Sequence, residues 1–239
     1  MIMKNKCKHA FILAGGLGTR LRSVVKDVPK PMAPVNGKPF LAYLMDYWVQ
    51  QGLTQFTLSV GYLGEIVQDY LGDAFEGVPV QYVREIEPLG TGGALRRALA
   101  AGAFGQDPTL MLNGDTWFEA SLSTLEKDFA ANKCPITIAL RKVDTNSRYG
   151  GVTLAENGLI AAFGDATSRL INSGCYIFSP TQIEERLLHS PEKFSLETDI
   201  LPKLASNGDL GASVQSGRFI DIGIPEDYHR FCANPPKLG

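Results

Sequence analysis

Short apolar runs alternate with helical patterns over the first 140 residues, and this alternation restricts the fold more than any other feature of the sequence. The runs are rich in β-branched and aliphatic side chains, which is typical of buried strands. Between them, apolar residues recur at helical spacing, as at Phe40, Leu44 and Trp48. We therefore predict an α/β fold: a Rossmann-like, mostly parallel sheet with helices on both faces and ligands at the carboxyl ends of the strands. The predicted strands are His9–Ala14, Gln55–Val60, Val78–Val83, Thr109–Leu112 and Pro135–Leu140.

The pattern changes after about residue 141. Three short segments separated by turns indicate a small antiparallel part, and two helices, a strand and a last helix beginning near Pro225 follow. No linker, repeat or low-complexity segment divides the chain, so we predict one domain over residues 1–239, with halves of about 1–140 and 141–239. The segments are Gly151–Leu154, Leu159–Phe163 and Leu170–Phe178, the helices are Pro180–His189 and Ser195–Ala205, and the strand is Arg218–Ile222.

Charge and cysteine usage exclude several classes of protein. The formal net charge is −2, so the chain lacks the basic footprint that a nucleic-acid polymer or an anionic membrane would require. The apolar run Ala10–Ala14 is too short for a signal peptide, and no segment approaches the ~18 apolar residues of a membrane span. The four cysteines lie far apart and form no C-x-x-C motif. We expect reduced thiols and a cytoplasmic protein that binds neither nucleic-acid polymer nor membrane.

A glycine-rich loop follows the first predicted strand. Its sequence, Gly15-Gly16-Leu17-Gly18-Thr19-Arg20-Leu21, allows backbone N–H groups to approach a phosphate chain, and Arg20 would add positive charge. A Rossmann fingerprint would need a third glycine in place of Leu21, and a P-loop would need Gly-Lys-Ser/Thr. The alternative is a tight strand-to-helix turn without a ligand.

A lysine held between two prolines lies about ten residues further on. Pro29 and Pro31 restrict the backbone on both sides of Lys30 and so keep its ammonium group in one place. A solvated lysine in a rigid turn is the alternative, but a surface lysine does not need such restraint. Together with the glycine loop, Lys30 predicts a phosphate-binding site.

These motifs resemble the signature of the sugar-1-phosphate nucleotidyltransferases, G-G-x-G-T-R-L followed by P-K-P-M-x-P. Within that family, the sequences of these motifs most resemble those of the D-glycero-α-D-manno-heptose 1-phosphate guanylyltransferases. The resemblance implies the nucleotidyltransferase fold and transfer of GMP from GTP to a heptose 1-phosphate, with release of pyrophosphate, for surface polysaccharide synthesis. It also implies that the first half binds the nucleotide and the second half the sugar phosphate. Further matching motifs are Glu87–Ala94, Leu112–Asp115, Arg148–Gly150, Ile171–Gly174, Phe194–Glu197 and Phe219–Tyr228.

The implied reaction needs no general base, because a phosphate monoester is already ionised at neutral pH, so catalysis reduces to positioning and charge neutralisation. The resemblance implies that Arg20 binds the departing β- and γ-phosphates and that Lys30 lies near the transferred α-phosphate. It also implies that Asp115 and Asp221 bind Mg²⁺, which prefers hard oxygen ligands; a turn or cap carboxylate is the alternative for each. The histidines, His9, His189 and His229, accompany no nucleophile and are expected to be structural or surface residues.

Glu87 stands where the resemblance places a base-reading side chain. A carboxylate accepts from both N1–H and N2–H₂ of guanine, whereas uracil or thymine fits an amide better, so guanine is preferred. An exposed glutamate before a proline is the alternative, and some uridylyltransferases also carry an acidic residue here. The other implied nucleotide contacts are Leu13, Gly15, Gly16, Gly18, Thr19, Arg20 and Gly92.

For the sugar, the resemblance implies contacts from Gly150, Asn172 and Glu197. The alternatives are a turn, a strand-end hydrogen bond and a first-turn helix residue, respectively. Most relatives carry a Glu-Lys pair before the Asn-x-Gly strand, and its lysine holds the sugar phosphate. The corresponding segment here, Phe163–Arg169, has no lysine. Either Arg169 substitutes for it, or the sugar phosphate is held differently.

Two other functions stay open at this point. One is a mannose-1-phosphate guanylyltransferase or a uridylyl- or thymidylyltransferase for another sugar 1-phosphate. The other is a non-catalytic regulatory protein that binds nucleotide sugars, and the intact motif residues speak against it. The expected partners are GTP and a sugar 1-phosphate, and a homodimer is the candidate oligomeric state.

Overall fold

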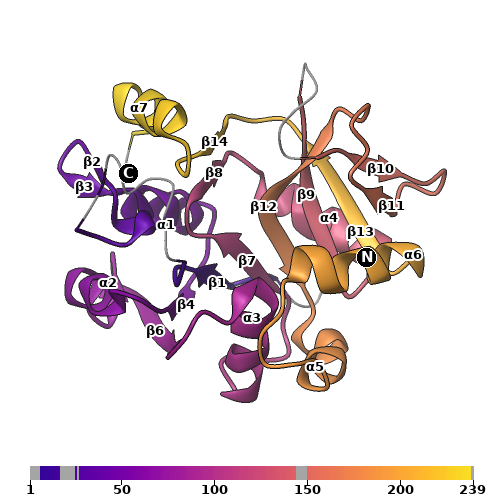
Figure 1. Cartoon of the computed structure of the whole chain (residues 1–239), viewed down its shortest axis with the longest axis horizontal. Coiled ribbons are helices and arrows are strands. Elements are labelled where there is room, and N and C mark those ends of the chain that lie inside the picture. The colour runs from indigo at the N-terminus through magenta and orange to yellow at the C-terminus, as the bar shows by residue number, and fades with distance from the viewer. Residues whose placement is uncertain (1–5, 17–24, 26, 144–149, 238–239) are drawn as a thin grey trace.

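The computed structural model of the chain describes residues 6–16, 25, 27–143 and 150–237. An eight-stranded sheet lies at its centre (Figure 1). In spatial order its strands are β13 (Leu210–Gln215), β9 (Ile136–Lys142), β12 (Leu170–Phe178), β7 (Thr109–Asn113), β1 (His9–Leu13), β4 (Gln55–Val60), β6 (Val78–Arg84) and β5 (Ala74–Phe75). Smaller ladders pair β2 (Pro34–Val35) with β3 (Lys38–Pro39), β8 (Thr116–Phe118) with β14 (Phe219–Asp221), and β10 (Val152–Leu154) with β11 (Ile160–Phe163).

The direction of the central strands defines a ligand crevice. Strand β1 is parallel to both of its neighbours, β4 and β7. The chain first adds β4 and β6 on one side of β1 and then returns to add β7 on the other side. Ligands of such sheets bind outside the carboxyl ends of the strands where this reversal occurs. The predicted α/β fold is confirmed, and its ligand crevice lies at the ends of β1 and β7.

The second half of the chain completes the same sheet. Strand β12 is antiparallel to both β7 and β9 and lies between them, and β10 pairs with β11 in a separate antiparallel hairpin. These strands confirm the predicted antiparallel part. Strand β13, which is parallel to β9, was not predicted, because its sequence of small and polar residues lacks a strong strand pattern.

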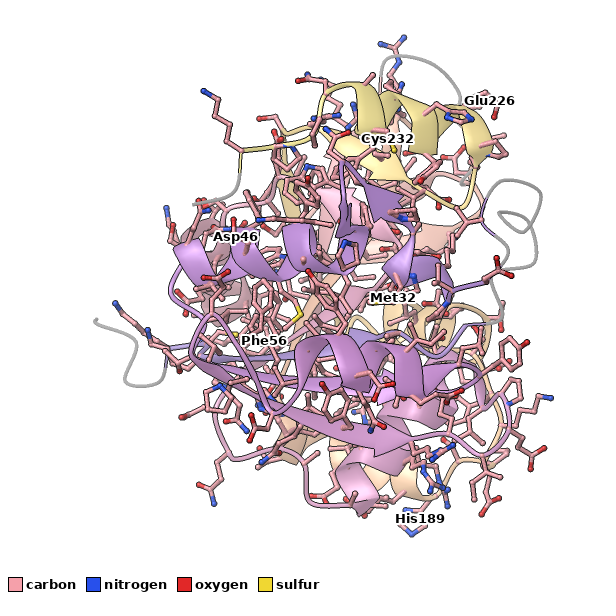
Figure 2. All side chains as sticks on the ribbon, turned by 90° about the vertical axis from the view of Figure 1, so that its left-hand side faces the viewer. Met32, Asp46, Phe56, His189, Glu226 and Cys232 are labelled. Atoms are coloured by element: carbon pink, nitrogen blue, oxygen red, sulfur yellow. The ribbon has the colours of Figure 1, made fainter. Side chains whose placement is uncertain are left out.

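Helices cover both faces of the sheet and bury the strands between two cores. On β1, Ala10 and Ile12 face one core, whereas Phe11 faces the other. The first core receives side chains from α1 (Phe40–Gln50), α2 (Gly64–Leu71), α4 (Leu122–Asn132) and α7 (Pro225–Ala233). The second receives them from α3 (Gly90–Ala100), α5 (Pro180–Leu188) and α6 (Leu201–Ser206). In the view of Figure 2, the labelled Phe56 lies in the interior and His189 at the periphery.

Two short turns, η2 (Lys30–Met32) and η3 (Leu196–Ile200), carry site residues. The predicted helix Ser195–Ala205 is divided into the π-helical turn η3 and α6, with Pro202 in the first turn of α6. Among the helices in the described parts of the chain, none has the length and apolar character needed to cross a membrane.

Candidate active site

A cavity of about 360 Å³ opens at the carboxyl ends of β1 and β7. It adjoins a second cavity of about 560 Å³, and the two share Gly15, Glu85 and Pro88. Volumes of this order are typical of small-ligand sites. The first cavity is lined by Leu13, Gly15, Gly16, Lys30, Pro31, Glu85, Pro88, Gly90, Thr91, Ala94, Asn113 and Asp115. Several predicted nucleotide contacts therefore converge where the topology of the sheet places a ligand.

Lys30 lies between the two predicted metal carboxylates. Its Nζ donates to Asp115 Oδ2 at 2.5 Å and lies 3.6 Å from Asp221 Oδ1. Lys30 comes from η2, which follows Pro29, and Asp115 comes directly after β7. Asp221 reaches the same point because β14 pairs with β8, where Asp221 is opposite Thr116. The pairing of two short strands thus joins residues that are distant in the sequence.

The carboxylate pair fits a divalent cation. Asp115 and Asp221 lie close enough to contact the same ammonium group, and both keep part of their side-chain surface exposed, 34% and 19%. Two hard oxygen donors with room for water or phosphate oxygens match the way Mg²⁺ binds to proteins. A Cβ on Gly223 beside them would collide with Lys30 Nζ and lie 2.8 Å from Asp221 Oδ1, so a larger residue there would displace the Lys30 ammonium. The described residues contain no group of three or more His, Cys, Asp or Glu side chains arranged to hold a metal, so here the remaining ligands would be water or phosphate oxygens.

The glycine loop is described only at its start. Gly15 lines both cavities, and a Cβ on it would lie 2.5 Å from Glu85 Oε1, so the close approach of the loop to this carboxylate requires glycine. Gly16 faces open space in the first cavity. The predicted contacts Gly18, Thr19 and Arg20 lie outside the described residues.

Glu85 is a buried carboxylate that sequence reasoning did not single out. Its side chain accepts from Ser59 Oγ at 2.7 Å and from the Leu89 N–H at 3.1 Å, and the residue is 9% exposed. Glu87, the predicted base-reading residue, is exposed and lines only the second cavity. The signal that would have found Glu85 is its position directly after the parallel strand β6, since ligand contacts collect at strand ends.

Gly92 packs against another segment of the protein. Its N–H and that of Gly93 both donate to Phe194 O, at 3.1 and 3.2 Å. A Cβ on Gly92 would collide with the Phe194 ring, and one on Gly90 would lie 2.5 Å from Phe194 O. The structure therefore gives Gly92 a packing role at the start of α3, whereas Gly90 and Thr91 line the first cavity.

The predicted sugar contacts Asn172 and Glu197 belong to one hydrogen-bond network. Asn172 Nδ2 donates to Tyr176 Oη at 2.9 Å, and the Tyr176 hydroxyl donates to Glu197 Oε1 at 3.3 Å. Burial and the nearby Glu197 carboxylate raise the pKa of Tyr176 well above 10, so its hydroxyl remains protonated and able to donate. Asn113, at the end of β7, adds a buried Oδ1 acceptor that has no hydrogen-bond partner among the described residues.

The remaining predicted sugar contacts, Gly150 and Arg169, are both exposed. Gly150 has a φ of +66°, which favours glycine. Arg169 forms no salt bridge with an acidic residue in the described part of the chain and follows a compact turn around Asp165. There Asp165 Oδ1 accepts from the Thr167 hydroxyl and N–H, and these bonds lower the pKa of the Asp165 carboxyl. This turn occupies the segment in which the resemblance implies a Glu-Lys pair, and it contains no lysine.

The crevice at the strand reversal, with Gly15 and Gly16 at its wall and a lysine shared by two carboxylates, offers the positioning and charge neutralisation that nucleotidyl transfer requires. The chain belongs to the nucleotidyl transferase family, whose sequence pattern it matches over residues 9–235. Its fold is the nucleotidyltransferase fold.

Two relatives of known activity are similar over nearly the whole chain. The D-glycero-α-D-manno-heptose 1-phosphate guanylyltransferase of Campylobacter jejuni is 40% identical over 229 residues, covering 95% of this chain and 99% of the relative. The enzyme of the same name from Aneurinibacillus thermoaerophilus is 40% identical over 224 residues, covering 93% and 96%. Among solved structures, HddC from Yersinia pseudotuberculosis has a TM-score of 0.82 and 37% identity over 95% of this chain and 98% of that one, and it has also been solved in complex with GMP-PN. The chain is thus a nucleotidyltransferase, and the two relatives that match it at 40% identity are both named guanylyltransferases.

Proposed function

We propose that the protein transfers GMP from GTP to D-glycero-α-D-manno-heptose 1-phosphate, giving GDP-heptose and pyrophosphate, for surface polysaccharide synthesis. The observation that carries the reaction class is the position of Lys30 between Asp115 and Asp221 at the mouth of the β1–β7 crevice. The choice of guanine and heptose is supported by the 40% identity to the two heptose 1-phosphate guanylyltransferases.

In this reaction an oxygen of the sugar phosphate attacks the α-phosphorus of GTP, and pyrophosphate leaves with the electron pair of the bond that breaks. The nucleophile is already ionised, so the protein need not remove a proton. Lys30 neutralises charge on the transferred phosphoryl group, and Arg20, outside the described residues, is proposed to bind the leaving pyrophosphate. Asp115 and Asp221 would hold Mg²⁺, which supplies further charge neutralisation when bound.

For base recognition we propose Glu85 in place of Glu87. Glu85 is buried and shared by both cavities, and its bonds from Ser59 and Leu89 orient the carboxylate while leaving further lone pairs for guanine N1–H and N2–H₂. A desolvated carboxylate discriminates between bases more strongly than an exposed one, because a mismatched base leaves it unpaired. Glu85→Gln should therefore reduce the preference for GTP over UTP by about 10–100-fold, or roughly 1–3 kcal/mol.

Glu87→Gln is the matched control, since it makes the same change two residues away on an exposed side chain. Its GTP preference should stay within about twofold of the wild type. The reverse pattern, with only Glu87→Gln losing selectivity, would restore Glu87 as the base-reading residue.

The function as a whole is tested by pyrophosphate release with four nucleoside triphosphates against heptose 1-phosphate, mannose 1-phosphate and glucose 1-phosphate. We expect the highest kcat/KM for GTP with heptose 1-phosphate. Mannose 1-phosphate is the second candidate acceptor, because the mannose-1-phosphate guanylyltransferase of Mycobacterium tuberculosis is 32% identical over 232 residues, although the match spans only 64% of that relative. No release with any pair would refute catalysis and leave the regulatory alternative.

We propose a cytoplasmic location, which is supported by the four free cysteines, three of which are buried. A homodimer stays a prediction, to be tested by analytical ultracentrifugation.

A further inference from the structure

Thr91 links the first cavity, where the predicted nucleotide contacts lie, to the predicted sugar contact Glu197. Thr91 lies in the first turn of α3 and lines the first cavity. Its hydroxyl donates to Glu197 Oε2 at 2.5 Å and accepts from the Leu196 N–H at 2.9 Å. The Thr91 side chain therefore forms hydrogen bonds with both the Glu197 carboxylate and the backbone of η3.

Two further hydroxyls fix the same carboxylate. Ser195 Oγ donates to Glu197 Oε2 at 2.8 Å, and the Tyr176 hydroxyl donates to Oε1 at 3.3 Å. A carboxylate has about four acceptor positions, so both on Oε2 are used and one remains on Oε1. Glu197 is thus held in one orientation with a single acceptor position for a substrate hydroxyl.

Backbone contacts fasten the segment that carries Glu197 to the start of α3. Phe194 O accepts from the N–H groups of Gly92 and Gly93, and the Phe194 N–H donates to Leu89 O at 3.0 Å. The absence of a Cβ on Gly90 and Gly92 permits this close packing. The first turn of α3 therefore holds the segment that carries Glu197 in place.

We infer that Thr91 is a positioning residue that, from the wall of the first cavity, orients the Glu197 carboxylate for the sugar subsite. The inference rests on the proposed function, because Glu197 is the predicted contact for the sugar of that reaction.

The test compares Thr91→Val with Thr91→Ser. Valine keeps the shape of threonine and removes the hydroxyl, whereas serine keeps the hydroxyl and removes the methyl group. With the sugar 1-phosphate that the wild type uses best, Thr91→Val should raise the KM for that substrate about tenfold and leave the KM for GTP and kcat within about twofold. Thr91→Ser should behave like the wild type. Thr57→Val is the matched control: it removes a buried hydroxyl that contacts His9, so both KM values should stay unchanged even if stability falls.

The inference is overturned if Thr91→Val leaves the sugar-phosphate KM unchanged, or if Thr91→Ser is impaired as strongly as Thr91→Val. If Thr91→Val does not fold, Thr91→Ala removes the same hydroxyl without adding a methyl group in its place and should give the same selective rise in KM; an unchanged KM there overturns the inference equally. Failure of the proposed function is distinguished by the wild type, which would then show no turnover with any sugar 1-phosphate.

Discussion

The positive charge of Lys30 stabilises the transition state more than the ground state, because negative charge spreads over the transferred phosphoryl group in the transition state. The Lys30 side chain is 15% exposed, and it is held by Asp115 and by the turn that follows Pro29. Lys30→Met should therefore lower kcat by about 10²-fold, or roughly 3 kcal/mol, with a smaller effect on the KM for GTP. Steady-state kinetics measure both constants. Full activity in Lys30→Met would show that Lys30 has a structural role in the turn and no role in catalysis. Lys203→Met on α6 is a surface control.

The carboxylate pair predicts dependence on a divalent cation. Asp115→Asn and Asp221→Asn each remove one negative oxygen donor and should each lower kcat by about 10²-fold, while the melting temperature changes little. Removal of metal with EDTA should abolish turnover, and added Mg²⁺ should restore it. Asp209→Asn, which affects only an exposed pair with Arg186, is the matched control. Undiminished turnover in EDTA would exclude the metal role.

His9 predicts a loss of stability in acid. Its Nε2 lies 2.9 Å from Thr57 Oγ1, and burial lowers the pKa of His9 from 6.5 to about 4. Because the unfolded chain binds a proton at a higher pH than the folded protein does, the contribution to stability is complete above pH 6.5 and falls as the pH drops toward 4, by about 3 kcal/mol at most.

Urea unfolding between pH 4.5 and 7.5 measures this contribution. His9→Gln should flatten the pH dependence of the unfolding free energy, whereas His229→Gln, on an exposed residue of α7, should not. Identical pH profiles for wild type and His9→Gln would assign the acid sensitivity to other groups.

At the scale of elements, α3 and the segment before η3 are held together by glycines. A Cβ on Gly92 would collide with the buried Phe194 ring. Gly92→Ala should therefore destabilise the protein by about 1–3 kcal/mol and raise the KM for sugar 1-phosphate, because the segment carrying Glu197 must shift. Gly105→Ala introduces the same methyl group into open space and is the control. Thermal unfolding and steady-state kinetics of both variants test this prediction. If Gly92→Ala and Gly105→Ala have the same melting temperature and the same KM for sugar 1-phosphate, the close packing has no functional consequence.

At the scale of the whole molecule, the two halves share one sheet. Strand β12 of the second half lies between β7 and β9 of the first half. The halves should therefore unfold in one transition, with tryptophan fluorescence and far-UV circular dichroism giving the same midpoint in urea. A chain ending at residue 140 should not fold, since β7 would lose its neighbour β12. Two separate transitions would show that the halves are independent.

The predictions from sequence succeeded where the signal was local. The strands β1, β4, β6, β7 and β9 were predicted within two residues at each end, because buried parallel strands appear as continuous apolar runs. Lys30 was predicted as a site residue from its flanking prolines, and Asp115 from its place after an apolar strand; the two side chains meet at one cavity, and their roles stay predictions. Strand β13 was missed because small and polar residues at a sheet edge carry little strand signal.

What the sequence by itself determined is therefore the class of fold, most of the strands and the residue types at the site. Tertiary structure alone decided which of these residues meet: Asp221 joins Asp115 through the pairing of β14 with β8, and Thr91 joins Glu197 across the start of α3. It also distinguished Glu85 from Glu87, which are two residues apart in the same polar stretch but differ in burial. The physical reason is that periodicity reports the local backbone and its buried face, whereas long-range pairing depends on how the elements pack together.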